Sequence, residues 1–157
     1  MTKGRRIPDL LATDSGDGSQ IHDTISVLLN TTAPAPPWTD AGFALAGTPG
    51  AAWLMAFGPL TPGSVVELSL SGAQPGAPAV LLLGTAVIDA PFKGGTLVPQ
   101  PQLLLGGFAV EPDGGLQLQG HWPTTPAGLQ IVGQWWIADA GGPAGFAASN
   151  GVSGVVP

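Results

Sequence analysis

Hydrophobic and polar residues alternate with a period of two along several short stretches of the chain. The clearest stretch is 65–71, where aliphatic residues occupy every second position and glutamate or serine the positions between them. A period of two is typical of a β-strand with one buried and one solvent-exposed face. In the stretch 129–138, two glutamines and Trp136 face away from the side that carries Trp135. Both stretches predict antiparallel strands with one wet face.

The longest uncharged apolar run lies at 77–88 and is followed by a loop rich in proline and glycine. The run predicts a fully buried central strand at 79–87, because it is uncharged, largely apolar and bounded by proline, glycine and aspartate. The loop 89–99, which contains Asp89 and Lys93, is predicted to have a fixed shape in which Gly94 or Gly95 adopts a positive φ. Lys93 is the only cation after residue 6, and we expect it to pair with a neighbouring carboxylate.

Glycine and proline number 25 and 17 residues, and they recur at intervals typical of turns between short strands. No stretch after residue 40 keeps a helical period over several turns, and the spacing of the prolines would interrupt a helix. The pattern predicts an all-β fold over residues 41–157, an antiparallel β-sandwich of the jelly-roll or immunoglobulin-like type. A closed barrel is the alternative. The expected core consists of Val66, Leu68, Leu70, Leu81, Leu83, Ile131 and Trp135.

An N-terminal arm, residues 1–32, precedes the predicted sandwich. Its residues 20–30 alternate with a period of two and predict one strand, and the Pro-rich residues 33–40 predict a stiff linker. A strand held away from its own domain must pair with something, so we expect the arm to dock on a neighbouring subunit or an underlying shell. The expected interface combines the apolar face of the strand with a basic tip: Ile21, Ile25, Val27, Leu29, Arg5 and Arg6.

The chain is acidic and poor in charge. Ten acidic residues outnumber four lysines and arginines, which gives a formal net charge of −6. This balance disfavours binding to nucleic acid or to anionic lipid. Charged residues amount to 9 % of the chain, well below the roughly 25 % typical of soluble domains. We therefore expect part of the surface to be covered by other protein chains.

Cysteine is absent, which excludes disulfides and thiolate metal sites. The apolar run at 77–88 is shorter than the ~20 residues of a membrane-spanning helix. The N-terminal residues lack the apolar segment of a classical secretory signal peptide. We expect no membrane insertion, and a location in a virion or an extracellular surface assembly.

Residues that could perform catalysis are few and scattered. His22 and His121 are the only histidines, and no Gly-x-Ser-x-Gly motif or EF-hand spacing of acids is present. We therefore expect no enzyme activity, no metal site and no cofactor. A glycan is the other ligand considered, because tryptophan rings offer flat apolar faces. Trp122 and Trp136 are the candidate contacts, unless these rings cover the ends of the core instead.

Four motifs lie in the second half of the chain: 71–78 (SGAQPGAP), 89–99 (DAPFKGGTLVP), 134–139 (QWWIAD) and 145–150 (GFAASN). Residues 68–157, which contain them, resemble a C-terminal β-rich module of large secreted proteins from planctomycete- and myxobacteria-type bacteria. The resemblance implies a structural or surface-exposed appendage without catalytic residues. That module usually ends a long exported polypeptide, whereas here it follows a short arm, which suggests use as a coat or assembly subunit.

Two functions are compatible with these features. The low charge, the arm and the lack of a catalytic motif favour a non-enzymatic structural protein that associates with itself or docks on a larger shell. Examples are a coat, decoration or surface-array subunit, for instance on a virus particle. The sandwich and its tryptophans favour a glycan-binding module instead. A large homo-oligomer in solution would indicate the first function, and a monomer retained on polysaccharide the second.

Overall fold

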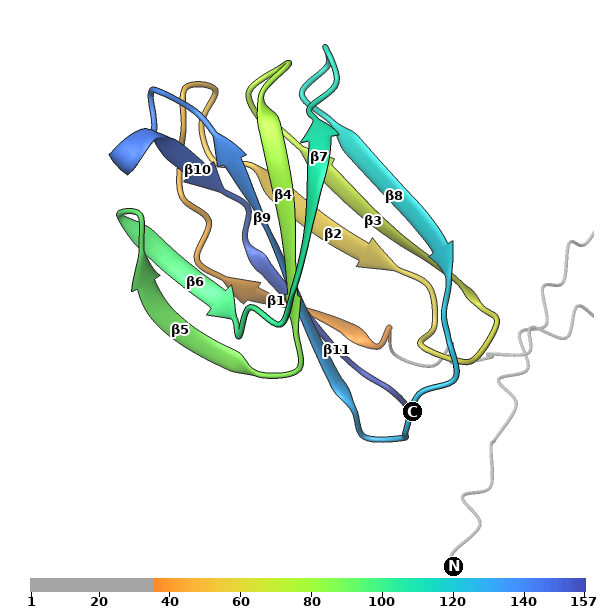
Figure 1. The fold of residues 1–157 in the computed structure, drawn as a ribbon. Coiled ribbons are helices and arrows are strands. Elements are labelled where there is room, and N and C mark those ends of the chain that lie inside the picture. Colours follow the sequence, from red (N-terminus) through yellow and green to blue (C-terminus); the bar gives the residue numbers. More distant parts are fainter. Residues whose placement is uncertain (1–35) are drawn as a thin grey trace, which may run out of the picture. The chain divides into compact units, whose positions relative to one another are not determined.

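Strands make up most of residues 36–157, the part of the chain that the computed structural model describes (Figure 1). The predicted all-β fold class is confirmed for these residues. The predictions for the arm lie outside the described residues. They concern the strand at 20–30 and the interface of Ile21, Ile25, Val27, Leu29, Arg5 and Arg6.

The strands are short and follow one another closely along the chain. Their bounds are β1 (Trp38–Gly42), β2 (Trp53–Phe57), β3 (Val65–Ser71), β4 (Pro78–Gly84), β5 (Val87–Phe92), β6 (Gly95–Pro99), β7 (Leu103–Ala109), β8 (Leu116–His121), β9 (Gln130–Ala138), β10 (Phe146–Ala148) and β11 (Gly151–Val155). One 3₁₀ turn, η1 (Pro143–Gly145), lies between β9 and β10.

The larger sheet contains six strands, in the order β1-β11-β9-β4-β7 with β10 also paired to β9, and the smaller sheet has the order β2-β3-β8. All the pairs are antiparallel. Strands β2, β3 and β8 take the places of strands A, B and E of an immunoglobulin-like sandwich, and β11, β9, β4 and β7 those of G, F, C and C′. Strand β1 extends the larger sheet beyond β11, and the hairpin of β5 and β6 is inserted between β4 and β7.

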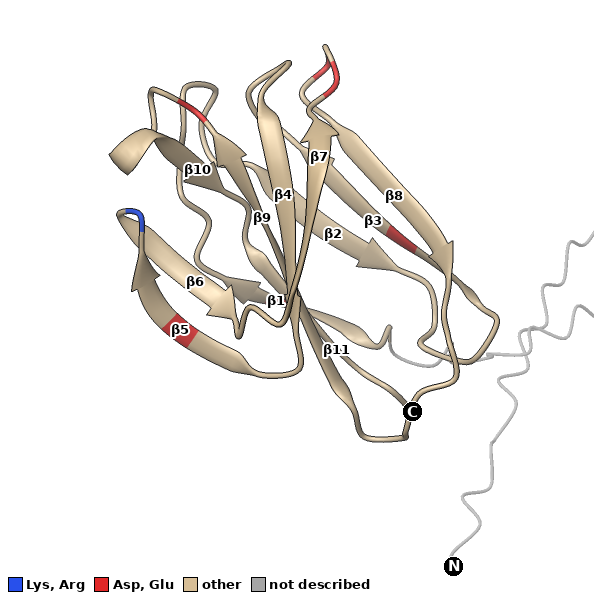
Figure 2. Ribbon diagram, in the orientation of Figure 1, with Lys and Arg blue, Asp and Glu red and all other residues tan. Residues whose placement is uncertain are grey.

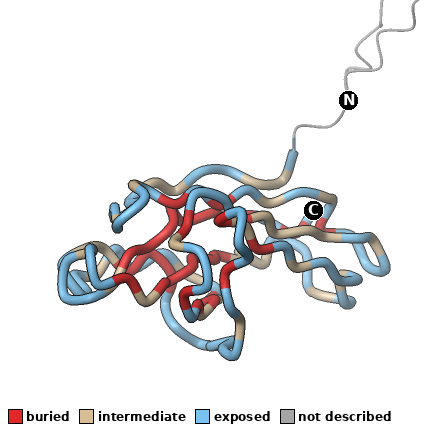
Figure 3. The backbone as a smooth tube through the Cα atoms, turned by 90° about the horizontal axis from the view of Figure 1, so that it is seen from above, coloured by how far each residue is buried: buried red, intermediate tan, exposed pale blue. Residues whose placement is uncertain are grey.

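An apolar core lies between the two sheets, and its buried segments form the centre of the fold in Figure 3. Leu54 and Leu70 of the smaller sheet belong to the same buried cluster as Leu81 and Trp135 of the larger sheet. The ring of Phe108 meets Trp135 edge to face, with the centroids 5.4 Å apart. Each such aliphatic side chain contributes roughly 1.5–3 kcal/mol when it leaves water, so this cluster supplies much of the stability of the sandwich.

Three of the predicted core residues, Leu70, Leu81 and Trp135, are buried. The other four are only half-buried: Val66, Leu68, Leu83 and Ile131. All four line an apolar cavity between the two sheets. Their period of two correctly assigns them to the inner face, but the sheets do not close over them.

The opposite face of the larger sheet is covered by the β5–β6 hairpin, which in Figure 1 lies on the side away from β2, β3 and β8. Leu82 and Trp136 of the sheet pack against Leu97 of the hairpin. The prediction that Gln134 and Trp136 lie on a wet face is therefore wrong. The β5–β6 hairpin covers this face in place of water. The alternation of residues within β9 does not predict this second layer.

Gln134 joins this second layer to the sheet. Its Oε1 atom accepts hydrogen bonds from the Val98 backbone N–H at 3.0 Å and from the Trp136 indole N–H at 3.1 Å. Its Nε2 atom donates to the carbonyl oxygens of Thr96 at 3.1 Å and Ser149 at 3.0 Å. Both donors and both acceptor positions of the amide are thus used, which is what allows it to be buried.

The predicted rigid loop 89–99 is a β-hairpin whose turn consists of Lys93 and Gly94. These two residues have φ values of 48° and 82°, as in the type I′ turn that suits the twist of a hairpin. Gly94 thus has the positive φ that was predicted for Gly94 or Gly95. Asp89 also has a positive φ, 45°, at the point where the pairing of β5 with β6 shifts register. The fixed shape comes from strand pairing and not from the prolines alone.

The first strand begins earlier than the sequence predicts. Trp38 and Thr39, assigned to the linker, are part of β1 and pair with β11. The Trp38 indole N–H donates to the Gly58 carbonyl oxygen at 3.0 Å. Its ring lies against Gly154, where a Cβ atom would come within 2.7 Å of it. Trp38 therefore fastens the start of the domain to the last strand.

Asn150 closes part of the edge of β2. Its Oδ1 atom accepts from the Leu54 backbone N–H at 2.7 Å, and its Nδ2 atom donates to the Leu54 carbonyl oxygen at 3.1 Å. Nδ2 also donates to Asp40 Oδ1 at 2.9 Å. The side-chain amide thus acts like the backbone of a neighbouring strand, and it holds the smaller sheet against the larger one.

Candidate interaction surfaces

The ionisable groups of residues 36–157 are dispersed (Figure 2). Within this part of the chain no group of three or more histidine, cysteine, aspartate and glutamate side chains could hold a metal ion. His121 is exposed, and its Nδ1 atom lies 3.2 Å from the Gly63 carbonyl oxygen. This contact ties His121 to the turn that precedes β3.

Asp139 is buried and fixes two loops. Its Oδ1 atom accepts from the Thr48 hydroxyl at 2.5 Å and from the Gly141 N–H at 2.9 Å, and its Oδ2 atom accepts from the Thr48 N–H at 2.7 Å. The Thr48 hydroxyl bond lowers the pKa of Asp139 below its usual 3.8, and the two backbone N–H groups add to this effect against the opposing effect of burial. The hydrogen bonds of this carboxylate therefore serve to hold the loops of Thr48 and Gly141 in place.

Lys93, expected to pair with a carboxylate, faces aromatic rings. Its Nζ atom lies 5.2 Å from the centroid of the Phe146 ring and 6.0 Å from that of Phe92. A lysine ammonium at such a distance is attracted by the electrons of the ring face. Lys93 and Gly94 thus help to hold the hairpin tip against the segment before β10, because a Cβ at Gly94 would meet Pro143 at 2.6 Å.

The structure separates the two tryptophans proposed as glycan contacts. Trp136 is 4 % exposed and meets Phe92 edge to face at 4.9 Å, so it cannot stack on a ligand and the proposed contact is wrong. Trp122 is half-buried, and its indole N–H donates to Thr125 Oγ1 at 2.9 Å. The alternative interpretation, that these rings cover the core, describes Trp136 and agrees with the position of Trp122 at the cavity.

An apolar row that sequence reasoning missed lies on the outer face of the smaller sheet. Trp53, Met55 and Phe57 of β2 are 45, 44 and 47 % exposed, whereas Leu54 between them is buried. In β3 the neighbours of the row are Ser71, Ser69 and Glu67. A hint was present in the sequence, because β2 is apolar at every position (WLMAF) although its partner alternates.

A second exposed apolar segment is the beginning of β7. Leu103, Leu104 and Leu105 are 49, 61 and 36 % exposed. Strand β7 is the last strand of the larger sheet, and its outer side has no strand partner within residues 36–157. A register shift relative to β4, near Gly107 with its φ of 86°, ends the leucine segment. The leucine segment is defined here as residues 103–105.

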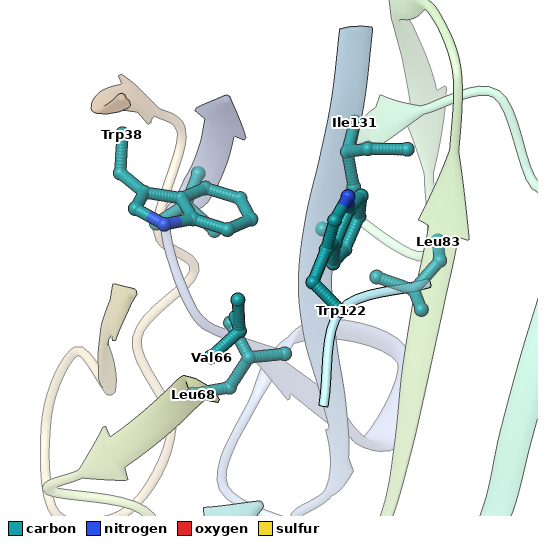
Figure 4. Close-up of a pocket in the computed structure, with 8 residues that line it drawn as sticks. Trp38, Val66, Leu68, Leu83, Trp122 and Ile131 are labelled. Atoms are coloured by element: carbon teal, nitrogen blue, oxygen red, sulfur yellow. The ribbon is translucent and has the colours of Figure 1, made fainter. Parts of the chain in front are cut away.

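An apolar cavity between the sheets lies one strand inward of this edge, beside β4. Trp38, Val66, Leu68, Leu83, Trp122 and Ile131 surround it from different strands and loops (Figure 4). Its volume is about 70 Å³, several times the ~10–15 Å³ that one water molecule requires. Leu83 lines the cavity and is the register partner of Leu103 in β7. The cavity and the leucine segment therefore adjoin across one strand pair.

Comparison with protein-family models, curated proteins and solved structures gives no match for this chain. The resemblance of residues 68–157 to a bacterial β-rich module rests on its motifs and stays a prediction. No helix within residues 36–157 is long and apolar enough to cross a membrane.

Proposed function

We propose that this chain is a non-enzymatic structural protein, a subunit of a coat, decoration layer or surface array, such as one on a virus particle, that docks through its N-terminal arm. The observation that carries the proposal is the exposed apolar row Trp53, Met55 and Phe57 on the outer face of the smaller sheet. Isolated surface hydrophobics are ordinary, but contiguous apolar rows on an ordered face are typical of surfaces that bind other proteins.

The scarcity of charge supports the same function. Residues 36–157 contain one cation, Lys93, and its ammonium group faces aromatic rings. Soluble monomers normally rely on many interspersed charges to stay apart. A surface with so few of them suits a subunit that is largely covered by its neighbours.

The experiment is the molar mass of the full chain in solution, measured by light scattering or sedimentation over a range of concentrations. We expect a homo-oligomer, and we expect Met55→Glu to lower its mass because a buried, unpaired carboxylate is costly at an interface. Gln100→Glu is the matched control, since it adds the same charge at an exposed position after β6, outside the smaller sheet. A monomer at every concentration would overturn the proposal.

A glycan-binding module is the second candidate function, favoured by the surroundings of Trp53. Ser69 and Ser71 of β3 lie beside the apolar row, and together with Gln117 and the acids Glu111 and Asp113 they line a polar hollow of about 300 Å³. Exposed aromatic faces next to hydroxyl and amide groups suit sugars. If the chain is a glycan-binding module, we expect a monomer that is retarded in gels containing a polysaccharide. Trp53→Ala should abolish the retardation, whereas Trp122→Ala should not.

A further inference from the structure

We propose that the outer edge of β7 is the acceptor site for residues 20–30 of a second copy of this chain, which add to the larger sheet as one more strand. This docking mode rests on the assembly role proposed above and specifies where the arm binds. The occupant is a segment of the chain itself, and the surface is the leucine segment with the adjoining cavity.

Strand β7 differs from the other sheet edges. The edge of β2 is partly closed by the amide of Asn150, which bonds both backbone groups of Leu54. Strand β1 carries the charged residue Asp40 and shifts its register with β11. In β8, glutamines alternate with leucines. The leucine segment has neither a charge nor a proline. An unprotected apolar edge of this kind pairs readily with another strand.

The leucine segment presents apolar side chains on both faces of the sheet. Leu103 and Leu105 are the register partners of Leu83 and Leu81, so they share the inner face of the sheet, whereas Leu104 is the partner of Leu82 and shares the hairpin face. A strand that pairs with this segment must therefore be apolar on both faces. Otherwise, polar side chains of the added strand would lie against leucines on one face of the sheet.

Residues 25–29 of the arm, Ile-Ser-Val-Leu-Leu, have the matching pattern. In an extended strand Ile25, Val27 and Leu29 share one face, and Leu28 lies on the other. The three-residue face fits the inner side, next to Leu103 and Leu105, and Leu28 fits the side of Leu104. Main-chain hydrogen bonds supply the rest of the affinity, as in other strand-addition complexes.

The length of the chain between the arm and β1 favours a second copy as the donor. The arm precedes β1, which lies at the opposite edge of the larger sheet from β7. Four strand spacings separate these edges, about 19 Å, and residues 31–37 span only about 22 Å as a polyproline-like segment. Because a path around the sandwich is longer than the straight line, pairing within one chain leaves no slack. Pairing between copies has no such limit.

Charge favours an antiparallel arrangement. The acidic residues Glu111 and Asp113 follow β7 directly. An antiparallel donor strand points its N-terminal side toward this end of β7, and the basic tip of Arg5 and Arg6 lies on that side of the donor strand. Opposite charges then meet at the same end of the interface, an attraction that added salt weakens.

The test uses the absence of cysteine in the chain, so that every disulfide formed is an engineered one. Full-length Leu28→Cys is mixed with full-length Leu104→Cys under mild oxidation, and the products are separated without reductant. We expect a heterodimer that forms at least about tenfold faster than with Gln119→Cys on β8 as the acceptor, because docking raises the effective concentration of the two thiols. Ser26→Cys as the donor serves as a second variant on the same face of the arm.

The possible results distinguish the β7 site, donation by a second copy and the assembly role itself. Equal rates at Leu104→Cys and Gln119→Cys would overturn the β7 site. In the double variant with both cysteines in one chain, an internal disulfide that forms even at high dilution would overturn donation by a second copy. An oligomer that persists without selective cross-linking would leave the assembly role standing and remove this docking mode, whereas a monomer in solution removes both.

Discussion

The two faces of the larger sheet are covered in different ways. The inner face meets the smaller sheet through a cluster of aliphatic and aromatic side chains that includes Leu81 and Trp135. The outer face meets the β5–β6 hairpin through a smaller apolar cluster around Trp136 and through the four hydrogen bonds of Gln134. Strand β9 contributes to both faces, with successive residues pointing to opposite sides.

The two faces contribute differently to the stability of the sandwich and to the position of the hairpin. Apolar contact is strong but non-directional, so the inner core stabilises the sandwich without fixing every neighbour. A buried amide is favourable only when all its partners are in place. Gln134 therefore specifies the position of the hairpin on the sheet, and the loss of one strand of that hairpin would leave its amide unsatisfied.

The largest effect is expected on the inner face. Leu81→Ala should lower the free energy of unfolding by about 3–5 kcal/mol, since the side chain is fully buried and its loss leaves a cavity. Leu83→Ala is the control, because Leu83 is half-buried beside an existing cavity and should cost clearly less. Chemical denaturation measures both. Equal losses would mean that the cavity is closed in solution.

Gln134→Leu tests the outer face at nearly equal volume. We expect a loss of about 2–3 kcal/mol, because the backbone groups of Thr96, Val98 and Ser149 are left without their partner. Amide hydrogen exchange should accelerate first in β5 and β6, while β3 and β8 stay protected. Uniform acceleration in all strands would contradict the separation of the two faces.

Gly94→Ala probes the tip of the hairpin. A loss of about 1–2 kcal/mol is expected, since Gly94 has a φ of 82° and a Cβ there would lie 2.6 Å from Pro143. At Gly95 the nearest atom is the flexible end of Leu45, at 2.9 Å, so Gly95→Ala should cost less. Melting temperatures of the two variants decide the question. If neither falls, the turn does not have the fixed shape described above.

The smallest effect is expected from Asp139, a buried carboxylate that directly follows β9. Its pKa is lowered in the folded protein by the Thr48 hydroxyl and by backbone N–H groups. The resulting stability is present above the unfolded pKa near 3.8 and is lost as the pH falls through the lower folded pKa. A melting curve from pH 7 to pH 2.5 should therefore decline below about pH 4. Thr48→Val should reduce that decline.

The sequence predicted the fold class and the inner core because both depend on local alternation, as at Leu70 and Trp135. It did not predict the hairpin over the outer face, since the partner of Trp136 lies about forty residues away in sequence, at Phe92. The row of Trp53, Met55 and Phe57 was missed for a related reason. A strand that is apolar at every position does not show which face is covered, and only its register with β3 decides this.

Lys93 has a practical consequence as the single lysine or arginine in residues 36–157. Trypsin cleaves after these residues, so Lys93 is the one position of the sandwich domain at which it can cut. In the closed hairpin this position is a tight turn with φ of 48°, which does not fit an extended protease cleft. The rate of cutting thus reports how often β5 and β6 come away from the sheet, separately from the unfolding of the sandwich, whenever reclosing is fast.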